Sequence, residues 1–180
     1  MNGAYVLLLT LLLITKEKKP TEHPKAVVSI FIDAPVESVF DYIVPIDLSH
    51  IFRRYKNLPA IDSTSNQERW YTPGMERTVY FEDGNTAHEH LISVNPSTDF
   101  SYQINGFTSF LGKLAEQING KWVFTEPQPG QTHIEWTYEL EPKNFLAGFI
   151  IRTFVLKNLK GLLNNALAII KDDLEMTESR

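Results

Sequence analysis

Cysteine is absent from the sequence, which excludes disulfide bonds, thiol catalysis and cysteine-based metal sites. Positive charge is also scarce, because the formal net charge is -5 and the pI is about 5.5. General nucleic-acid binding needs a basic face, so we expect no nucleic-acid partner. Nucleophile elbows, phosphate-binding loops and metalloprotease motifs are missing, and we expect no cofactor. Ligand binding, catalysis without a thiol and protein interaction remain as function classes.

Long apolar runs are rare, and the clearest lies near the N-terminus, from Tyr5 to Ile14. A helix over residues 1–15 reaches only about 22 Å, which is short of the ~30 Å hydrocarbon core of a bilayer. No small-residue cleavage site of a signal peptide follows the run. The next residues include Lys16, Lys18 and Lys19, so the positive-inside rule keeps the rest of the chain in the cytoplasm.

We therefore expect residues 1–24 to form an apolar segment with a linker, and residues 25–180 to form one domain. The segment 1–15 is interpreted as an anchor that holds a cytoplasmic protein at the inner face of the membrane. Two alternatives stay open for this segment. It is a truncated anchor, or it packs in a dimer.

The longest periodic pattern runs from Asn144 to Glu175, where apolar residues recur at helical spacing without a proline. We expect one amphipathic helix of roughly 50 Å, with Asn144 as its N-cap. Arg152 lies inside the apolar stripe of this helix. The stripe itself comprises Phe145, Phe149, Leu156, Leu163, Leu167, Ile170 and Leu174. Further apolar residues on the otherwise polar face are Leu146, Ile150 and Phe154.

Between Leu58 and Pro142 the apolar period changes to two, which is typical of strands. Two short helices, before Pro45 and over residues 47–54, and a first strand at 26–33 precede this stretch. Short connections imply an antiparallel sheet, and we expect an α+β fold in which about seven strands curl around the long C-terminal helix. The other expected strands lie near 58–66, 75–82, 86–95, 98–106, 118–126 and 131–141.

The alternation along each strand assigns side chains to the concave face of the sheet. Ile92 and Val94 set the inward phase of their strand, and this phase also places His88 and His90 inward. Large aromatic rings can line a cavity without filling it, although they can also form an ordinary packed core. The predicted cavity residues are His88, His90, Tyr102, Trp122, Phe124, Trp136 and Tyr138 on the sheet, and Phe149, Arg152 and Leu156 on the helix.

Charged and ionisable side chains give only weak signals of chemistry. Two histidines on one strand face, His88 and His90, lack a third ligand, so we predict no metal site. They are interpreted as ordinary hydrogen-bonded histidines, and general acid–base catalysis is the alternative. We expect Arg77 and Glu89, on neighbouring strands, to pair as surface charges.

The segment Phe107–Gln117 joins two strands and is unusually apolar for a connection. It either docks on the core or forms a gate over the entrance to the cavity, where it would meet the first turns of the long helix. The predicted gate residues are Phe107, Phe110, Leu111, Leu146, Ile150 and Phe154.

Short motifs follow one another in a distinctive order over residues 26–175. Examples are Ile32-Asp33-Ala34-Pro35-Val36, Pro73-Gly74-Met75-Glu76-Arg77, Asn95-Pro96 and Gly120-Lys121-Trp122. Together they resemble the polyketide cyclase/dehydrase and lipid-transport (SRPBCC) family of the START-like, helix-grip superfamily. The resemblance implies a seven-stranded antiparallel sheet wrapped around the long helix, with a cavity for an apolar ligand between them. It supplies no catalytic residues, and the superfamily includes carriers, cyclases and hydrolases, so fold alone does not choose a function.

We expect the protein to bind or transport a hydrophobic or amphipathic, lipid-like ligand in this internal cavity. Arg152 is expected to meet an acidic head group of the ligand, whose tail points toward Trp136 and Phe124. One alternative is an enzyme of the polyketide cyclase/dehydrase type that acts through His88, His90 and Tyr102. The other is a protein-interaction module on the same fold. The residues favour binding over catalysis.

Overall fold

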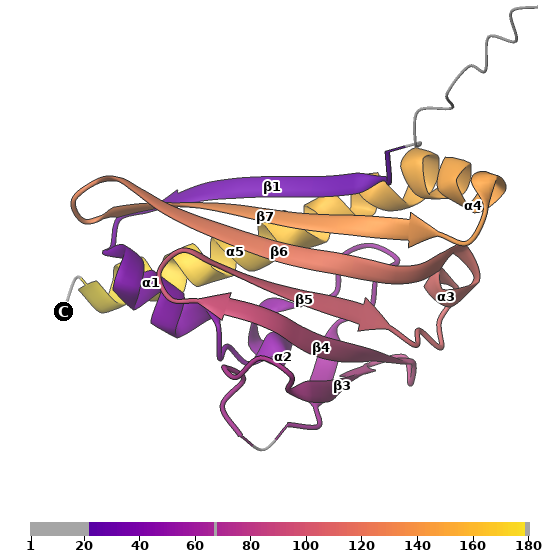
Figure 1. Cartoon of the computed structure of the whole chain (residues 1–180), viewed down its shortest axis with the longest axis horizontal. Helices are drawn as coiled ribbons and strands as arrows, with labels where there is room; N and C mark the ends of the chain where they lie inside the picture. The colour runs from indigo at the N-terminus through magenta and orange to yellow at the C-terminus, as the bar shows by residue number, and fades with distance from the viewer. Residues whose placement is uncertain (1–21, 67, 179–180) are drawn as a thin grey trace, which may run out of the picture.

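A curved antiparallel sheet of seven strands wraps one long C-terminal helix in the computed structural model, which describes residues 22–66 and 68–178 (Figure 1). The order across the sheet is β1-β7-β6-β5-β4-β3-β2, so β2 to β7 form a meander and β1 closes the edge beside β7. The predicted α+β helix-grip fold is confirmed. The strands are β1 (Lys25–Ile32), β2 (Ile61–Thr64), β3 (Glu76–Phe81), β4 (Thr86–Asn95), β5 (Asp99–Asn105), β6 (Ala115–Gln128) and β7 (Gln131–Pro142).

Two short helices follow β1, as the sequence predicts, and a side-chain cap marks the start of the second of them and of the C-terminal helix. Asp47 caps α2, because its Oδ1 accepts a hydrogen bond from the backbone N–H of Ser49 at 2.9 Å. Asn144 caps the C-terminal helix in the same way, through the N–H of Ala147 at 2.9 Å. The helices are α1 (Val36–Ile43), α2 (Leu48–Ile51), α3 (Leu111–Leu114), α4 (Phe145–Ile150), the π-helical turn η1 (Ile151–Val155) and α5 (Leu156–Glu178).

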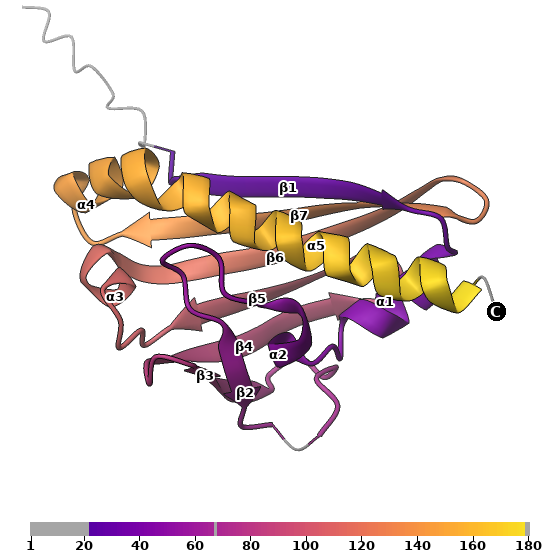
Figure 2. The ribbon, with the colours of Figure 1, turned by 180° about the vertical axis from the view of Figure 1, so that it is seen from behind.

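The apolar stripe of α5 faces the concave side of the sheet and packs along β1 (Figure 2). Leu163 and Ile170 are fully buried, and Leu174 is nearly so. Burial of each such side chain stabilises the fold by about 1.5–3 kcal/mol. The predicted face is therefore confirmed for α5.

The prediction of the buried face is wrong for the first turns of the long helix. Phe145 and Phe149 are 87% and 57% exposed. The cause is η1, because its wider turn follows an i→i+5 spacing and shifts the phase of the residues before it relative to α5. A strict period of 3.6 residues continued through the turn therefore misplaces Phe145 and Phe149.

The aromatic residues of β5, β6 and β7 form a packed core between the sheet and the helices. The rings of Trp122 and Trp136 stack with centroids 4.0 Å apart, and Phe100 stacks on Trp122 at 5.6 Å. Phe40 of α1 meets the edge of Phe124 at 5.2 Å. These rings are almost completely buried, so they behave as an ordinary core.

The predicted membrane anchor, residues 1–15, lies outside the described residues. Within residues 22–66 and 68–178, no helix is both long enough and apolar enough to cross a bilayer. Cytoplasmic location and attachment to the membrane stay predictions.

The packing of Trp136 sets a clear expectation for stability. Its side chain is 1% exposed, so Trp136→Ala should lower the free energy of unfolding by about 3–5 kcal/mol. Urea denaturation measures this loss. Phe31→Ala, at a 52% exposed position, is the control and should cost less than about 1 kcal/mol. Equal small losses in both variants would contradict a tightly packed tryptophan.

Candidate functional site

A β-bulge in β4 decides which of its side chains face the interior. The register of β4 with β5 shifts between Leu91 and Ser93, and Ile92 at this point is 46% exposed. An extra residue in a strand reverses the alternation on either side of it. Glu89 therefore points inward, although the phase set by Ile92 and Val94 predicts the opposite.

The same bulge places both histidines on the outer face of the sheet, and their assignment to the cavity is wrong. His90 Nδ1 lies 2.9 Å from Glu76 Oε1, and His88 Nδ1 lies 3.3 Å from Thr78 Oγ1. Both histidines therefore have hydrogen-bond partners on β3. The described part of the chain contains no group of three His, Asp or Glu side chains arranged to hold a metal ion.

Arg77 of β3 and Glu89 of β4 form a buried ion pair, whereas the sequence suggests a surface pair. Arg77 Nε donates to Glu89 Oε2 at 2.5 Å, and the two side chains are only 5% and 4% exposed. The guanidinium also lies over the ring of Trp70, 4.1 Å from its centroid. Burial raises the pKa of Glu89 above its ordinary value, against the opposing effect of the Arg77 charge.

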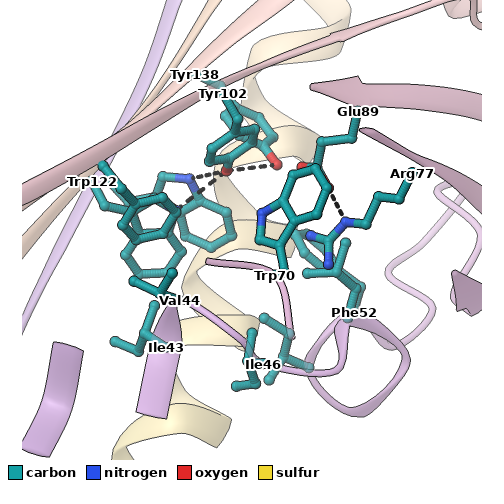
Figure 3. A pocket seen from close by; sticks show the side chains of 14 residues that line it. Ile43, Val44, Ile46, Phe52, Trp70, Arg77, Glu89, Tyr102, Trp122 and Tyr138 are labelled. Atoms are coloured by element: carbon teal, nitrogen blue, oxygen red, sulfur yellow. Dashed lines mark hydrogen bonds and ion pairs between the residues drawn. The ribbon is translucent and has the colours of Figure 1, made fainter. Parts of the chain in front are cut away.

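Tyr102 is the centre of a hydrogen-bond network beside this ion pair (Figure 3). Its hydroxyl oxygen accepts from Trp136 Nε1 at 2.9 Å and from Trp122 Nε1 at 3.3 Å, and it donates to the Tyr138 hydroxyl at 3.3 Å. Burial raises the pKa of Tyr102 and of Tyr138, so both stay protonated near neutral pH. Gly120 permits this arrangement, because a Cβ there would lie 2.4 Å from the Tyr102 ring.

The side chains in Figure 3 enclose a cavity of about 20 Å³, which is the size of one water molecule. A much larger pocket of about 480 Å³ adjoins it between the sheet, α3 and α5. Glu89 and Tyr138 line both spaces, so the buried polar cluster forms one wall of the large pocket.

Most of the large pocket is apolar. Its polar residues other than Glu89 and Tyr138 come from connecting segments. They are Asn57, Asp83, Asn85 and Ser109. The apolar lining comprises Leu48, Phe52, Leu58, Pro59, Ile61, Phe81, Ile104, Phe110, Leu111, Leu114, Val155, Leu159 and Leu162.

The pocket has acidic side chains at two places, at Glu89 on β4 and at Asp83 in the connection between β3 and β4. Hydrogen bonds from Asn85 hold the pKa of Asp83 below its ordinary value, so Asp83 is ionised near neutral pH. The pocket thus combines an apolar middle with acidic or hydrogen-bonding groups at two places. Its polar groups can accept hydrogen bonds more readily than they can bind an anion.

The predicted cavity residues on the sheet separate into four groups. Tyr138 lines the large pocket. Phe124 lies in the packed core and lines neither space, whereas His88 and His90 lie outside. The residues that border only the small cavity are Tyr102, Trp122 and Trp136.

The helix residues predicted for the cavity do not line it, and η1 is the cause for Phe149 and Arg152, which precede α5. Phe149 is exposed, and Leu156 is half-buried against the core. Arg152 is exposed, and its Nη2 donates to the carbonyl oxygen of Glu22 at 2.6 Å. Arg152 therefore does not line the cavity, and its contact with a ligand head group stays a prediction.

The predicted gate residues also divide. Phe110 and Leu111 line the large pocket, while Phe107 and Ile150 are half-buried against the core. The other two, Leu146 and Phe154, are 65% and 66% exposed and line neither space. Opening and closing of this segment stays a prediction.

Several pocket residues had no signal in the sequence. Trp70 lies outside regular structure, and the segment 57–59 reaches the pocket through the irregular connection between α2 and β2. Leu159 and Leu162 of α5 also border the pocket, and no helical pattern predicts this position. The sequence does predict that Arg77 pairs with Glu89. It does not predict that the pair is buried.

The chain matches the family described as polyketide cyclase / dehydrase and lipid transport over residues 23–175. No protein with a curated description matches it. Several solved structures share its fold at low sequence identity, which supports the fold alone.

A protein from Nitrosospira multiformis is 20% identical, with a TM-score of 0.62, over 87% of this chain and 100% of that one. Ara h 8.0201 is 19% identical, with a TM-score of 0.64, over 85% of this chain and 98% of that one. The major latex-like protein 151 from Panax ginseng is 11% identical, with a TM-score of 0.62, over 84% of this chain and 97% of that one.

The buried position of Glu89 predicts an unusual dependence of stability on pH. Its raised pKa means that the folded state keeps a proton above pH 4.5, where the unfolded state has lost it. The contribution of this group to stability is therefore largest below pH 4.5 and declines as pH rises through its folded pKa. Glu89→Gln removes this titration. As pH rises, the free energy of unfolding of the variant should therefore increase relative to that of the wild type.

Chemical denaturation across a range of pH measures this difference. Glu135→Gln, the same substitution at an exposed position of β7, is the control and should follow the wild type at every pH. A constant offset between Glu89→Gln and the wild type would contradict the raised pKa.

Proposed function

Because the chain belongs to the polyketide cyclase/dehydrase and lipid transport family, we propose that it binds a neutral, amphipathic small molecule in the large pocket between the sheet, α3 and α5. The observation that carries the proposal is the pocket itself. Its volume of about 480 Å³ lies within the range of ~300–1,000 Å³ that is usual for small-molecule sites. An apolar lining with a few polar groups is the composition that such sites share.

The polar groups of the pocket limit the chemistry of the ligand. Glu89 accepts hydrogen bonds, and Tyr138 can donate or accept one. A hydroxyl or N–H group of the ligand suits this wall, because it would donate to a buried acceptor. A carboxylate or phosphate does not suit it, since Glu89 and Asp83 both carry or can carry negative charge. We therefore propose a neutral ligand in place of the acidic one expected from Arg152.

An enzyme remains the second candidate, and Glu89 is the observation that favours it. A buried carboxyl group with a raised pKa, on the wall of a pocket, has the properties of a general acid or base. His88 and His90 no longer support this candidate, because they lie on the outer face. Chemical conversion of a bound molecule by the wild type but not by Glu89→Gln would favour the enzyme over the carrier.

A substitution that fills the pocket tests the proposal. Ile104 of β5 lines the pocket directly opposite Glu89 in the β4–β5 register. Ile104→Trp should weaken binding of the neutral probe N-phenyl-1-naphthylamine by about tenfold or more, because the indole ring occupies the ligand volume. Titration of probe fluorescence, which rises in an apolar site, measures the affinity.

Ile92→Trp is the matched control, since it introduces the same side chain on the neighbouring strand but on the outer face. It should bind the probe as the wild type does. Thermal unfolding of both variants checks that each is folded. Equal affinity of the wild type and Ile104→Trp, or no probe binding to the wild type, would overturn the proposal.

A further inference from the structure

Four large apolar side chains are exposed together at one end of the molecule, on α4 and η1. Phe145, Leu146, Phe149 and Phe154 are 87%, 65%, 57% and 66% exposed. The opposite side of α4 carries the buried Ala147 and Gly148. We call the four exposed residues the α4–η1 surface. It lies where β7 ends and β1 begins (Figures 1 and 2).

The π-helical turn creates this surface. In a continuous α-helix, Phe145 and Phe149 would share the buried stripe of α5. In the π-helical turn, residues five apart lie above one another, so Phe154 follows Phe149 on the same outer side. The turn thus directs Phe145 and Phe149 to solvent, although a regular helix would bury both rings. This arrangement exposes apolar area that adds nothing to the core.

The helical stretch that carries this surface is basic, whereas the whole protein is acidic. The net charge of the chain is -5, yet no Asp or Glu occurs between Glu141 and Asp172. The basic residues in that stretch are Lys143, Arg152, Lys157, Lys160 and Lys171. Lys143 precedes α4 and lies 3.8 Å from Glu116 Oε2, whereas Arg152 belongs to η1. Exposed apolar rings on a helical stretch whose own charges are all basic match the pattern of segments that lie in the interface of an anionic membrane.

The path of the chain adds a second argument. Glu22, the first described residue, is fixed next to this surface because its carbonyl oxygen accepts the hydrogen bond from Arg152 at 2.6 Å. Lys16, Lys18 and Lys19 precede it by a few residues, so they stay within about 20 Å of Glu22 even in a fully extended chain. The apolar run Tyr5–Ile14 comes directly before them. A second apolar and basic segment therefore starts from this end of the molecule.

We propose that the α4–η1 surface binds an anionic lipid membrane. Apolar rings enter the interface between head groups and acyl chains, and the lysine and arginine side chains meet lipid phosphates. A second copy of the chain fits less well, because two such surfaces would bring like charges together. The proposal does not rest on ligand binding in the pocket. The pocket nevertheless reaches the same end of the molecule, since Val155 of η1 and the exposed Phe110 line it.

The first experiment is co-sedimentation of the full-length protein with phosphatidylcholine vesicles, with and without phosphatidylglycerol. The wild type should bind the anionic vesicles and bind the neutral ones at least about tenfold less. Phe149→Ser combined with Phe154→Ser should weaken binding to anionic vesicles by about tenfold, because two apolar rings are lost from the interface. Phe31→Ser combined with Ile92→Ser is the matched control, at exposed apolar positions elsewhere, and should bind as the wild type.

The second experiment uses the absence of cysteine in the chain. Phe149→Cys and Met176→Cys, at exposed positions toward the two ends of the long helix, each accept one environment-sensitive fluorophore. Anionic vesicles should shift the emission of the label at position 149 to the blue and leave the label at position 176 unchanged.

Three results would overturn the proposal. One is unchanged vesicle binding of the double Phe149→Ser, Phe154→Ser variant, which would assign all binding to residues 1–21. Another is a blue-shifted label at position 149 before lipid is added, which would indicate that the N-terminal segment or a second copy covers the surface. The third is equal binding to neutral and anionic vesicles.

Discussion

Burial of the apolar stripe of α5 against the curved sheet is the interaction on which the rest of the structure depends. Leu163 and Ile170 are fully buried there, and the helix packs along β1. Because one helix cannot cover all seven strands, the part of the sheet farther from β1 is covered by α2, α3 and connecting segments instead. The large pocket lies beneath this less regular cover.

The polar wall of the large pocket lies beneath this cover and contains one member of a buried ion pair, Glu89. A buried ion pair such as Arg77–Glu89 gains little net stability over a well-packed apolar pair, because both charges lose water. Its cation–π contact with Trp70 compensates in part. Such a group is better explained by recognition or chemistry than by stability, which is why Glu89 limits the proposed ligand and favours the enzyme as second candidate.

The repetitive parts of the fold were predictable from the sequence, and the single-residue irregularities were not. Alternation of period two and the helical stripe predicted the seven strands and α5. Neither the bulge at Ile92 nor the π-helical turn η1 has a residue pattern of its own, yet each reverses or rotates the side chains beyond it. Consequently Glu89 faces the interior, where the pattern predicts His88 and His90. Phe149 and Arg152 are exposed, although the pattern predicts them in the interior. The loop residues of the pocket depend on tertiary contacts that no local pattern records.

Methyl NMR of the full-length protein tests most directly whether the space beneath the irregular cover is the binding site. N-phenyl-1-naphthylamine is added to protein labelled at leucine and isoleucine methyl groups. The account predicts shifts at Ile61, Ile104, Leu159 and Leu162, which line the pocket, and little change at Leu163 and Ile170, which pack against the sheet. Shifts confined to residues outside the pocket, such as Leu146, or no shifts at any concentration, would contradict it.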